Sequence, residues 1–95
     1  MNYLEIDNNH LWHPYNSLPS KTPIWAVKKT KKSKIYFEDA KVLVDGMSSW
    51  WSAIHGYNNK RIYKALKKQA KTMPHIMFGG LTHEPASILA KNLVN

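Results

Sequence analysis

Three short stretches rich in β-branched and aromatic residues lie in the first half of the chain, separated by charged and turn-forming residues. They cover residues 24–29, 34–37 and 42–45, and each is typical of a short strand. Residues 38–41, Glu-Asp-Ala-Lys, predict a tight turn between the second and third strands. Three antiparallel strands are about the smallest sheet that is stable by itself, so we expect a small antiparallel sheet here.

The second half of the chain changes to helical spacing. From Lys60 onward one face of a predicted helix is apolar and the opposite face carries lysines, until Pro74 ends the pattern. The first face comprises Ile62, Leu66, Gln69, Ala70 and Met73, all apolar except Gln69, and the basic face comprises Lys64, Lys67, Lys68 and Lys71.

A second helix is predicted to begin at Thr82, which can cap it, with Glu84 near its positive end. Its apolar stripe is still running at Asn95, with no glycine, proline or capping residue to stop it. The stripe consists of Ala86, Leu89, Ala90 and Leu93. Strands followed by an unfinished helix make a poor closed domain but a reasonable first piece of a larger α/β protein.

The first 23 residues predict an irregular arm. Pro14, Pro19 and Pro23 stand among Asn and Ser, which favour turns, and at most a short helix fits near residues 3–10. The domain organisation expected from the sequence is therefore an N-terminal arm, residues 1–23, followed by an incomplete N-terminal portion of a larger domain, residues 24–95.

Composition places the chain in a broad class. Ninety-five residues suffice for one small domain, which would bury about 60–70% of the surface of its unfolded chain. There is no cysteine, and no apolar run reaches the roughly 20 residues of a membrane span. The N-terminus lacks the basic and apolar regions of a secretory signal, so we expect a cytoplasmic protein.

The net charge of +8 is mainly local, because five lysines stand between positions 28 and 34 and without them 8 − 5 = +3 remains. Such a tract attracts nucleic acid or an anionic membrane. Against this, lysine outnumbers arginine 13 to 1, and arginine is the usual residue for bidentate phosphate recognition. A solvated hairpin tip is the simpler interpretation, and a small basic nucleic-acid-binding protein stays an alternative. The five lysines are Lys28, Lys29, Lys31, Lys32 and Lys34.

The most informative segment is residues 44–58, VDGMSSWWSAIHGYN. A buried strand normally carries residues without unpaired polar atoms, whereas each indole N–H needs a partner if it is buried. If the segment is extended, side chains alternate and Trp50 and Trp51 face opposite ways. One indole could then be core while the other lines a cavity, so we expect a ligand site here.

This segment resembles the class III pyridoxal-phosphate-dependent aminotransferases. The resemblance extends upstream to HPYNS (13–17) and downstream to HIMFGGLTH (75–83), and so covers nearly the whole chain. Within that family it favours the branch that moves the amino group of S-adenosylmethionine to 8-amino-7-oxononanoate in biotin synthesis, giving 7,8-diaminononanoate. It implies pyridoxal 5'-phosphate as cofactor and a homodimer of type I aminotransferase fold, an α/β fold. A class III aminotransferase with another donor and acceptor stays an alternative.

The resemblance assigns substrate-binding roles to Tyr15 and Trp50. In the family, the tyrosine of the first block and the first tryptophan of the SSWW block line the substrate pocket, against the donor's adenine or the keto-acid acceptor. Flat aromatic faces suit that role. Judged from pattern alone, both residues would instead be ordinary core or interface aromatics, and Trp12, Trp25 and Trp51 are expected to pack.

The residues that perform transamination are not expected in this segment. The chemistry needs a lysine that forms a Schiff base and an acidic partner for the pyridine nitrogen. In the resembled family both lie well beyond position 95, so we expect no catalytic and no cofactor-binding residue here, and no activity from this chain alone.

Two weaker signals remain. The histidines do not have the spacing of a zinc site and no cysteine accompanies them, so we expect no metal; His55 is expected to shape a turn through its ring. Gly79 and Gly80 precede a predicted helix start, where backbone can approach a ligand. The resemblance places that block near the active site and dimer interface, without a specific contact. The histidines are His10, His13, His55, His75 and His83.

Overall fold

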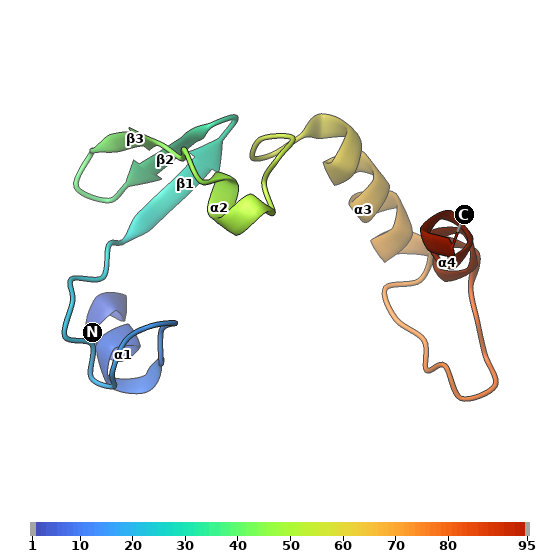
Figure 1. Cartoon of the computed structure of the whole chain (residues 1–95), viewed down its shortest axis with the longest axis horizontal. Coiled ribbons are helices and arrows are strands. Elements are labelled where there is room, and N and C mark those ends of the chain that lie inside the picture. The colour runs from blue at the N-terminus through green and yellow to red at the C-terminus, as the bar shows by residue number, and fades with distance from the viewer. Residues whose placement is uncertain (1, 95) are drawn as a thin grey trace. The chain divides into compact units, whose positions relative to one another are not determined.

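The computed structural model describes residues 2–94, which divide into two compact units at the Asn59–Lys60 bond. The first unit contains helix α1 (Tyr3–His10), strands β1 (Val27–Lys31), β2 (Lys34–Phe37) and β3 (Val42–Val44), and the short helical turn α2 (Ser48–Trp51) (Figure 1). The second contains helices α3 (Lys60–Thr72) and α4 (Glu84–Val94). The predicted α/β element order is confirmed.

The predicted three-stranded sheet is present, in the order β1-β2-β3 with both pairs antiparallel. The turn between β2 and β3 lies where the sequence placed it, closed by the amide of Phe37, which donates to the carbonyl of Lys41 at 2.9 Å. Ala40 in that turn has φ 68°, a left-handed value that glycine adopts more easily.

The prediction for the first strand was wrong by about three residues. The ladder runs over Val27–Lys31, and pairs Lys31 with Lys34 across the hairpin tip. Register shifts between Val27 and Lys29, so Lys28 forms an irregularity of the β-bulge kind. A strand with three lysines carries little apolar alternation, and its pairing is set by the neighbouring strand and the tip instead.

Helix α1 confirms the short helix predicted in the arm, and Asn2 caps it by accepting from the amide of Leu4 at 3.1 Å. Helix α3 confirms the helix predicted after Lys60 and ends at Thr72. That position agrees with the rule that the residue before a proline, here Met73 before Pro74, is pushed out of helical geometry.

Helix α4 starts two residues later than predicted. Thr82 does not cap it; His83 does, its Nδ1 accepting from the amide of Ala86 at 3.3 Å. The side chain that accepts from the third helical residue occupies the N-cap position. Histidine is an uncommon cap, so the threonine beside it was the stronger sequence signal.

No side chain among residues 2–94 is fully buried, and most large apolar side chains are exposed. The described residues therefore form no buried core of their own. The apolar faces of a helix or sheet need a second layer to cover them, and within each unit the elements supply too little of one. No helix within the described part of the chain is long and apolar enough to cross a membrane.

Candidate functional site

Tyr15 and Trp50, the two residues singled out from the sequence, lie against each other. Their ring centroids are 6.0 Å apart and the ring planes meet at 78°, an edge-on contact of the kind that aromatic pairs prefer. Tyr15 is 99% exposed and Trp50 54%. Both rings are open on one side, so a flat ligand can reach them.

Tyr15 is presented by a turn that its neighbour Asn16 builds. The Asn16 carboxamide oxygen accepts from the amides of Ser17 at 2.9 Å and Lys21 at 3.2 Å. The Asn16 backbone carbonyl accepts from the indole N–H of Trp12 at 2.7 Å. Tyr15 itself has φ 57°. Trp12 was expected to pack, but its side chain is 77% exposed, and its indole N–H braces this turn instead.

Trp50 lies in a left-handed turn, and the extended geometry considered for it is wrong. All four residues of α2 have positive φ, with Ser48 at 49°, Ser49 at 47°, Trp50 at 53° and Trp51 at 68°. An L-residue in this conformation costs about 1–2 kcal/mol, and a run of them is rare. The alternation argument for the two indoles therefore does not apply, and both are exposed.

Asp45, directly after β3, anchors the Trp50 turn. Its Oδ1 accepts from the amide of Met47 at 3.1 Å. Its Oδ2 accepts from the amide of Ser49 at 2.7 Å, from the Ser49 hydroxyl at 2.9 Å and from the hydroxyl of Tyr57 at 2.5 Å. The hydroxyls of Ser49 and Tyr57 also contact each other.

These contacts shift two pKa values in opposite directions. The Tyr57 hydroxyl, and then Ser49, stabilise the Asp45 carboxylate and lower the pKa of Asp45. The same hydrogen bond raises the pKa of Tyr57, because losing the phenol proton would leave two negative groups face to face.

Sequence reasoning missed Asp45 and Tyr57. One signal was available, since an aspartate followed closely by serines often bonds the backbone ahead of it. The contact with Tyr57, twelve residues away, is a tertiary one that the sequence gives no means to find.

The tip of the β1–β2 hairpin is joined to the segment after the Trp50 turn. The Tyr57 amide donates to the Lys32 carbonyl at 2.7 Å, and the Lys32 amide donates back to the Tyr57 carbonyl at 3.1 Å. Asn58 adds a side-chain bond to the Thr30 carbonyl at 2.6 Å. Gly56 lies under this bridge with φ +79°, and a Cβ there would lie 3.2 Å from the Lys32 oxygen.

The expected role for His55 was wrong in its detail. Its ring makes no hydrogen bond within residues 2–94; only its backbone carbonyl accepts, from Asn59 at 3.4 Å. The turn is formed by Gly56, whose amide donates to the Ala53 carbonyl at 2.9 Å. Positive φ at this point is what requires the glycine.

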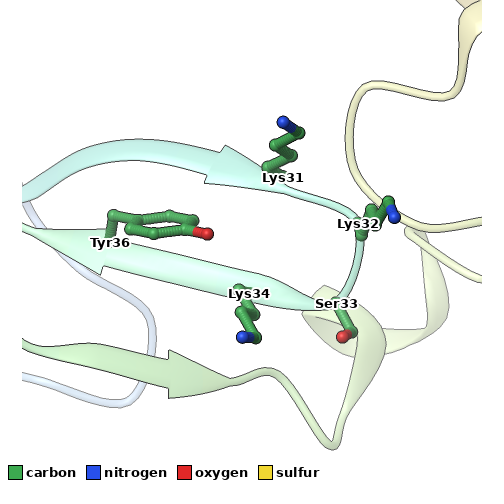
Figure 2. Close-up of a pocket in the computed structure, with 5 residues that line it drawn as sticks. All are labelled: Lys31, Lys32, Ser33, Lys34 and Tyr36. Carbon is green, nitrogen blue, oxygen red and sulfur yellow. The ribbon is translucent and has the colours of Figure 1, made fainter.

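The lysine tract forms the exposed hairpin tip that its simpler interpretation predicted. Figure 2 shows the side chains of Lys31, Lys32 and Lys34 pointing away from one another around a shallow hollow that Ser33 and Tyr36 also line. The amino group of Lys29 lies 4.9 Å from the centre of the Tyr36 ring. Lys31 and Lys34 are direct cross-strand partners, a pairing of like charges that destabilises a sheet.

The glycine pair lies in the second unit, in the segment before α4. Gly80 has φ +82° and neither Gly79 nor Gly80 has an atom within 4 Å of where a Cβ would stand. The ring of Phe78 packs edge-on against His83, with centroids 5.2 Å apart. Open backbone is present here, and nothing in its surroundings assigns it a ligand.

The described residues were compared with the requirements of a metal site and of a Schiff-base lysine. No group of three or more His, Cys, Asp or Glu side chains converges within residues 2–94. All 13 lysines are exposed, whereas a Schiff-base lysine works from a desolvated site or beside another cation. No lysine among residues 2–94 therefore lies in a desolvated site of the kind that a Schiff-base lysine uses.

Comparison with known proteins decides the family. A family model described as "Aminotransferase class-III" matches residues 15–95. The chain belongs to the class III aminotransferase family. This membership confirms the resemblance found in the three motif blocks.

Several curated relatives of this class III aminotransferase chain carry the same name. The adenosylmethionine-8-amino-7-oxononanoate aminotransferase of Buchnera aphidicola subsp. Baizongia pistaciae is 50% identical over 93 residues, covering 98% of this chain and 22% of the relative. The chain spans about a fifth of the length of the curated relatives it matches.

Solved structures give the same fold. The adenosylmethionine-8-amino-7-oxononanoate aminotransferase of Methanocaldococcus jannaschii has a TM-score of 0.82 at 26% identity, over 95% of this chain and 21% of that one. An omega transaminase of Pseudomonas jessenii in complex with PMP has a TM-score of 0.84 at 27% identity, over 99% of this chain and 21% of that one. The fold is part of a pyridoxal-phosphate aminotransferase fold, as predicted.

Proposed function

We propose that this chain is part of an enzyme that transfers the amino group of S-adenosylmethionine to 8-amino-7-oxononanoate, giving 7,8-diaminononanoate in biotin biosynthesis. The family membership and the name shared by relatives up to 50% identical support this. The donor is favoured over other class III donors by the SSWW and MFGG blocks of the sequence.

Tyr15 and Trp50 form one wall of the substrate pocket in this proposal. The supporting observation is their edge-on contact at 6.0 Å, made while both rings stay exposed. When two aromatic rings meet at a steep angle, the face of one ring can stack on an adenine or pack along an aliphatic chain. The edge of the other ring then limits the site on one side. The Tyr15 hydroxyl adds a single directional hydrogen bond.

The remaining parts of the enzyme lie outside this chain. Pyridoxal phosphate, when bound, supplies the electron sink and carries the amino group between the two substrates, and its main ligands are elsewhere in the protein. Residues 1–23 serve as an N-terminal arm and residues 24–95 as an incomplete N-terminal portion of the aminotransferase domain. The whole enzyme is a cytoplasmic homodimer, with neither nucleic acid nor membrane as a partner.

A chimera tests the proposal. This chain replaces the matching residues of the Buchnera aphidicola relative, and the purified chimera is assayed for 7,8-diaminononanoate with S-adenosylmethionine as donor. Activity is expected from the chimera and none from the 95-residue chain alone. A chimera that dimerises and takes up cofactor but makes no product overturns the proposal.

Two substitutions test the wall. Trp50→Ala and Tyr15→Ala are expected to raise the KM for S-adenosylmethionine by roughly ten-fold, because stacking of a base on an aromatic ring contributes about 1–3 kcal/mol. Trp25→Ala is the matched control: it removes another exposed indole from an edge-on pair, with Phe37 at 6.3 Å. An equal KM for all three variants contradicts the assignment of Tyr15 and Trp50.

The same chimera separates the alternatives. Faster turnover with a different amino donor would favour another class III aminotransferase. Salt-sensitive binding of DNA or RNA by the 95-residue chain, lost when the lysines at the hairpin tip are replaced by glutamine, would favour the nucleic-acid-binding alternative.

A further inference from the structure

The left-handed conformation of the Trp50 turn, residues 48–51, is not one that these residues favour by themselves. Residues 48–51 all have positive φ, and an isolated turn of L-residues relaxes out of that region. Backbone strain of this kind persists only where surrounding contacts impose it. Whatever imposes it here also sets the position of the Trp50 ring.

Both sets of imposing contacts start from the sheet. Asp45 follows β3 directly and takes hydrogen bonds from the Met47 and Ser49 amides. Tyr57 is fixed to the hairpin tip by its two backbone bonds with Lys32. The Tyr57 hydroxyl then meets the Asp45 carboxylate at 2.5 Å, so the turn is held from both ends.

We propose that Asp45 and Tyr57 are positioning residues: by holding residues 48–51 in the left-handed turn, they keep Trp50 edge-on to Tyr15 and so set the affinity for the amino donor. Neither side chain needs to touch the substrate. The proposal rests on the assignment of Trp50 and Tyr15 as a substrate wall. It goes beyond that assignment because it says that Asp45 and Tyr57, which do not belong to the wall, determine the position of the Trp50 ring within it.

The test uses Tyr57→Phe and Asp45→Asn in the full-length chimera. Tyr57→Phe removes one hydroxyl and keeps the ring, and Asp45→Asn turns one accepting oxygen into a donor. The matched controls are Tyr36→Phe, whose hydroxyl makes no hydrogen bond within residues 2–94, and Asp39→Asn. The second weakens the exposed ion pair with Lys41 and keeps an oxygen that can accept from the Lys41 amide. Each variant is measured for KM and kcat with S-adenosylmethionine.

Tyr57→Phe and Asp45→Asn are expected to raise the KM for the donor by about two- to ten-fold, the range of a lost aromatic contact. The kcat should stay within about two-fold, since a contact made equally in the ground and transition states changes KM alone. Both controls should match the parent. An unchanged KM in Tyr57→Phe and Asp45→Asn overturns the proposal.

A double-mutant cycle separates positioning from general stability. If Tyr57 acts through Trp50, Tyr57→Phe should add nothing to the KM of Trp50→Ala, because coupled residues are non-additive. Additive effects overturn the proposal and leave the substrate wall standing. If Trp50→Ala itself leaves KM unchanged, the substrate wall fails first, and the positioning proposal falls with it.

Discussion

Gly56 is the most sharply constrained glycine of the chain, and Gly56→Ala should weaken the bridge between the hairpin tip and the Trp50 turn. The substitution places an L-residue at φ +79°, which costs about 1–2 kcal/mol. The new methyl group would also lie 3.2 Å from the Lys32 carbonyl oxygen, the atom that accepts the Tyr57 amide at 2.7 Å. The carbonyl must shift by a few tenths of an ångström, which stretches that bond.

Amide hydrogen exchange at Tyr57 measures this effect directly. A loss of about 1–2 kcal/mol in the free energy of opening makes exchange roughly ten-fold faster. The assay is run on the full-length chimera, with Gly46→Ala as control, because a Cβ at Gly46 has no neighbour within 4 Å and its φ lies outside the left-handed region. Equal exchange rates in the two variants would refute the reasoning.

Three further predictions follow from the first unit. Ala40→Gly should stabilise the β2–β3 turn by about 0.5–1 kcal/mol, because φ 68° is relieved, and slow amide exchange in β2. Lys31→Glu should stabilise the β1–β2 hairpin by about 0.2–1 kcal/mol, because it places opposite charges on the cross-strand pair with Lys34, and the gain should shrink at high salt. Thermal melting measures the change, and a destabilised hairpin would contradict the strand register. The bond between Asp45 and Tyr57 should stabilise the fold between their usual pKa values of 3.8 and 10.0. This stabilisation should be lost as pH falls through the lowered pKa of Asp45 or rises through the raised pKa of Tyr57. Tyr57→Phe should remove the alkaline loss, and an unchanged profile contradicts it.

Elements with a strong internal period were predictable. Helix α3 carries its apolar residues on one face over three turns and ends at a proline, so its bounds were found within two residues. Strand β2 has aromatic and β-branched residues between turn signals and was placed correctly. In both cases the local sequence and the final structure favour the same conformation.

Elements set by neighbours were not predictable. Strand β1 has the composition VKKTK, which is no strand pattern, and it is paired by β2. His83 caps α4 because its side chain, and not that of Thr82, accepts a hydrogen bond from the Ala86 amide. A propensity is a weak prior where a partner fixes the register.

The candidate site divides in the same way. The motif blocks assigned Tyr15 and Trp50 to one wall, and those residues are 35 positions apart in the sequence. Their contact at 6.0 Å depends on left-handed backbone at Tyr15 and at residues 48–51. No pattern of side chains in the sequence predicts that backbone conformation. Non-glycine residues adopt such geometry only where other contacts impose it.

The sequence by itself determined the family, the small antiparallel sheet and the basic hairpin tip, and it singled out the two aromatic residues of the proposed wall. These follow from residue types and their spacing, which are local. The tertiary structure alone decided the left-handed turn at Trp50 and the hydrogen bonds of Asp45 and Tyr57 that hold it. The reason is physical: each residue of that turn is unfavourable alone, so its conformation is settled by contacts from residues distant in the chain.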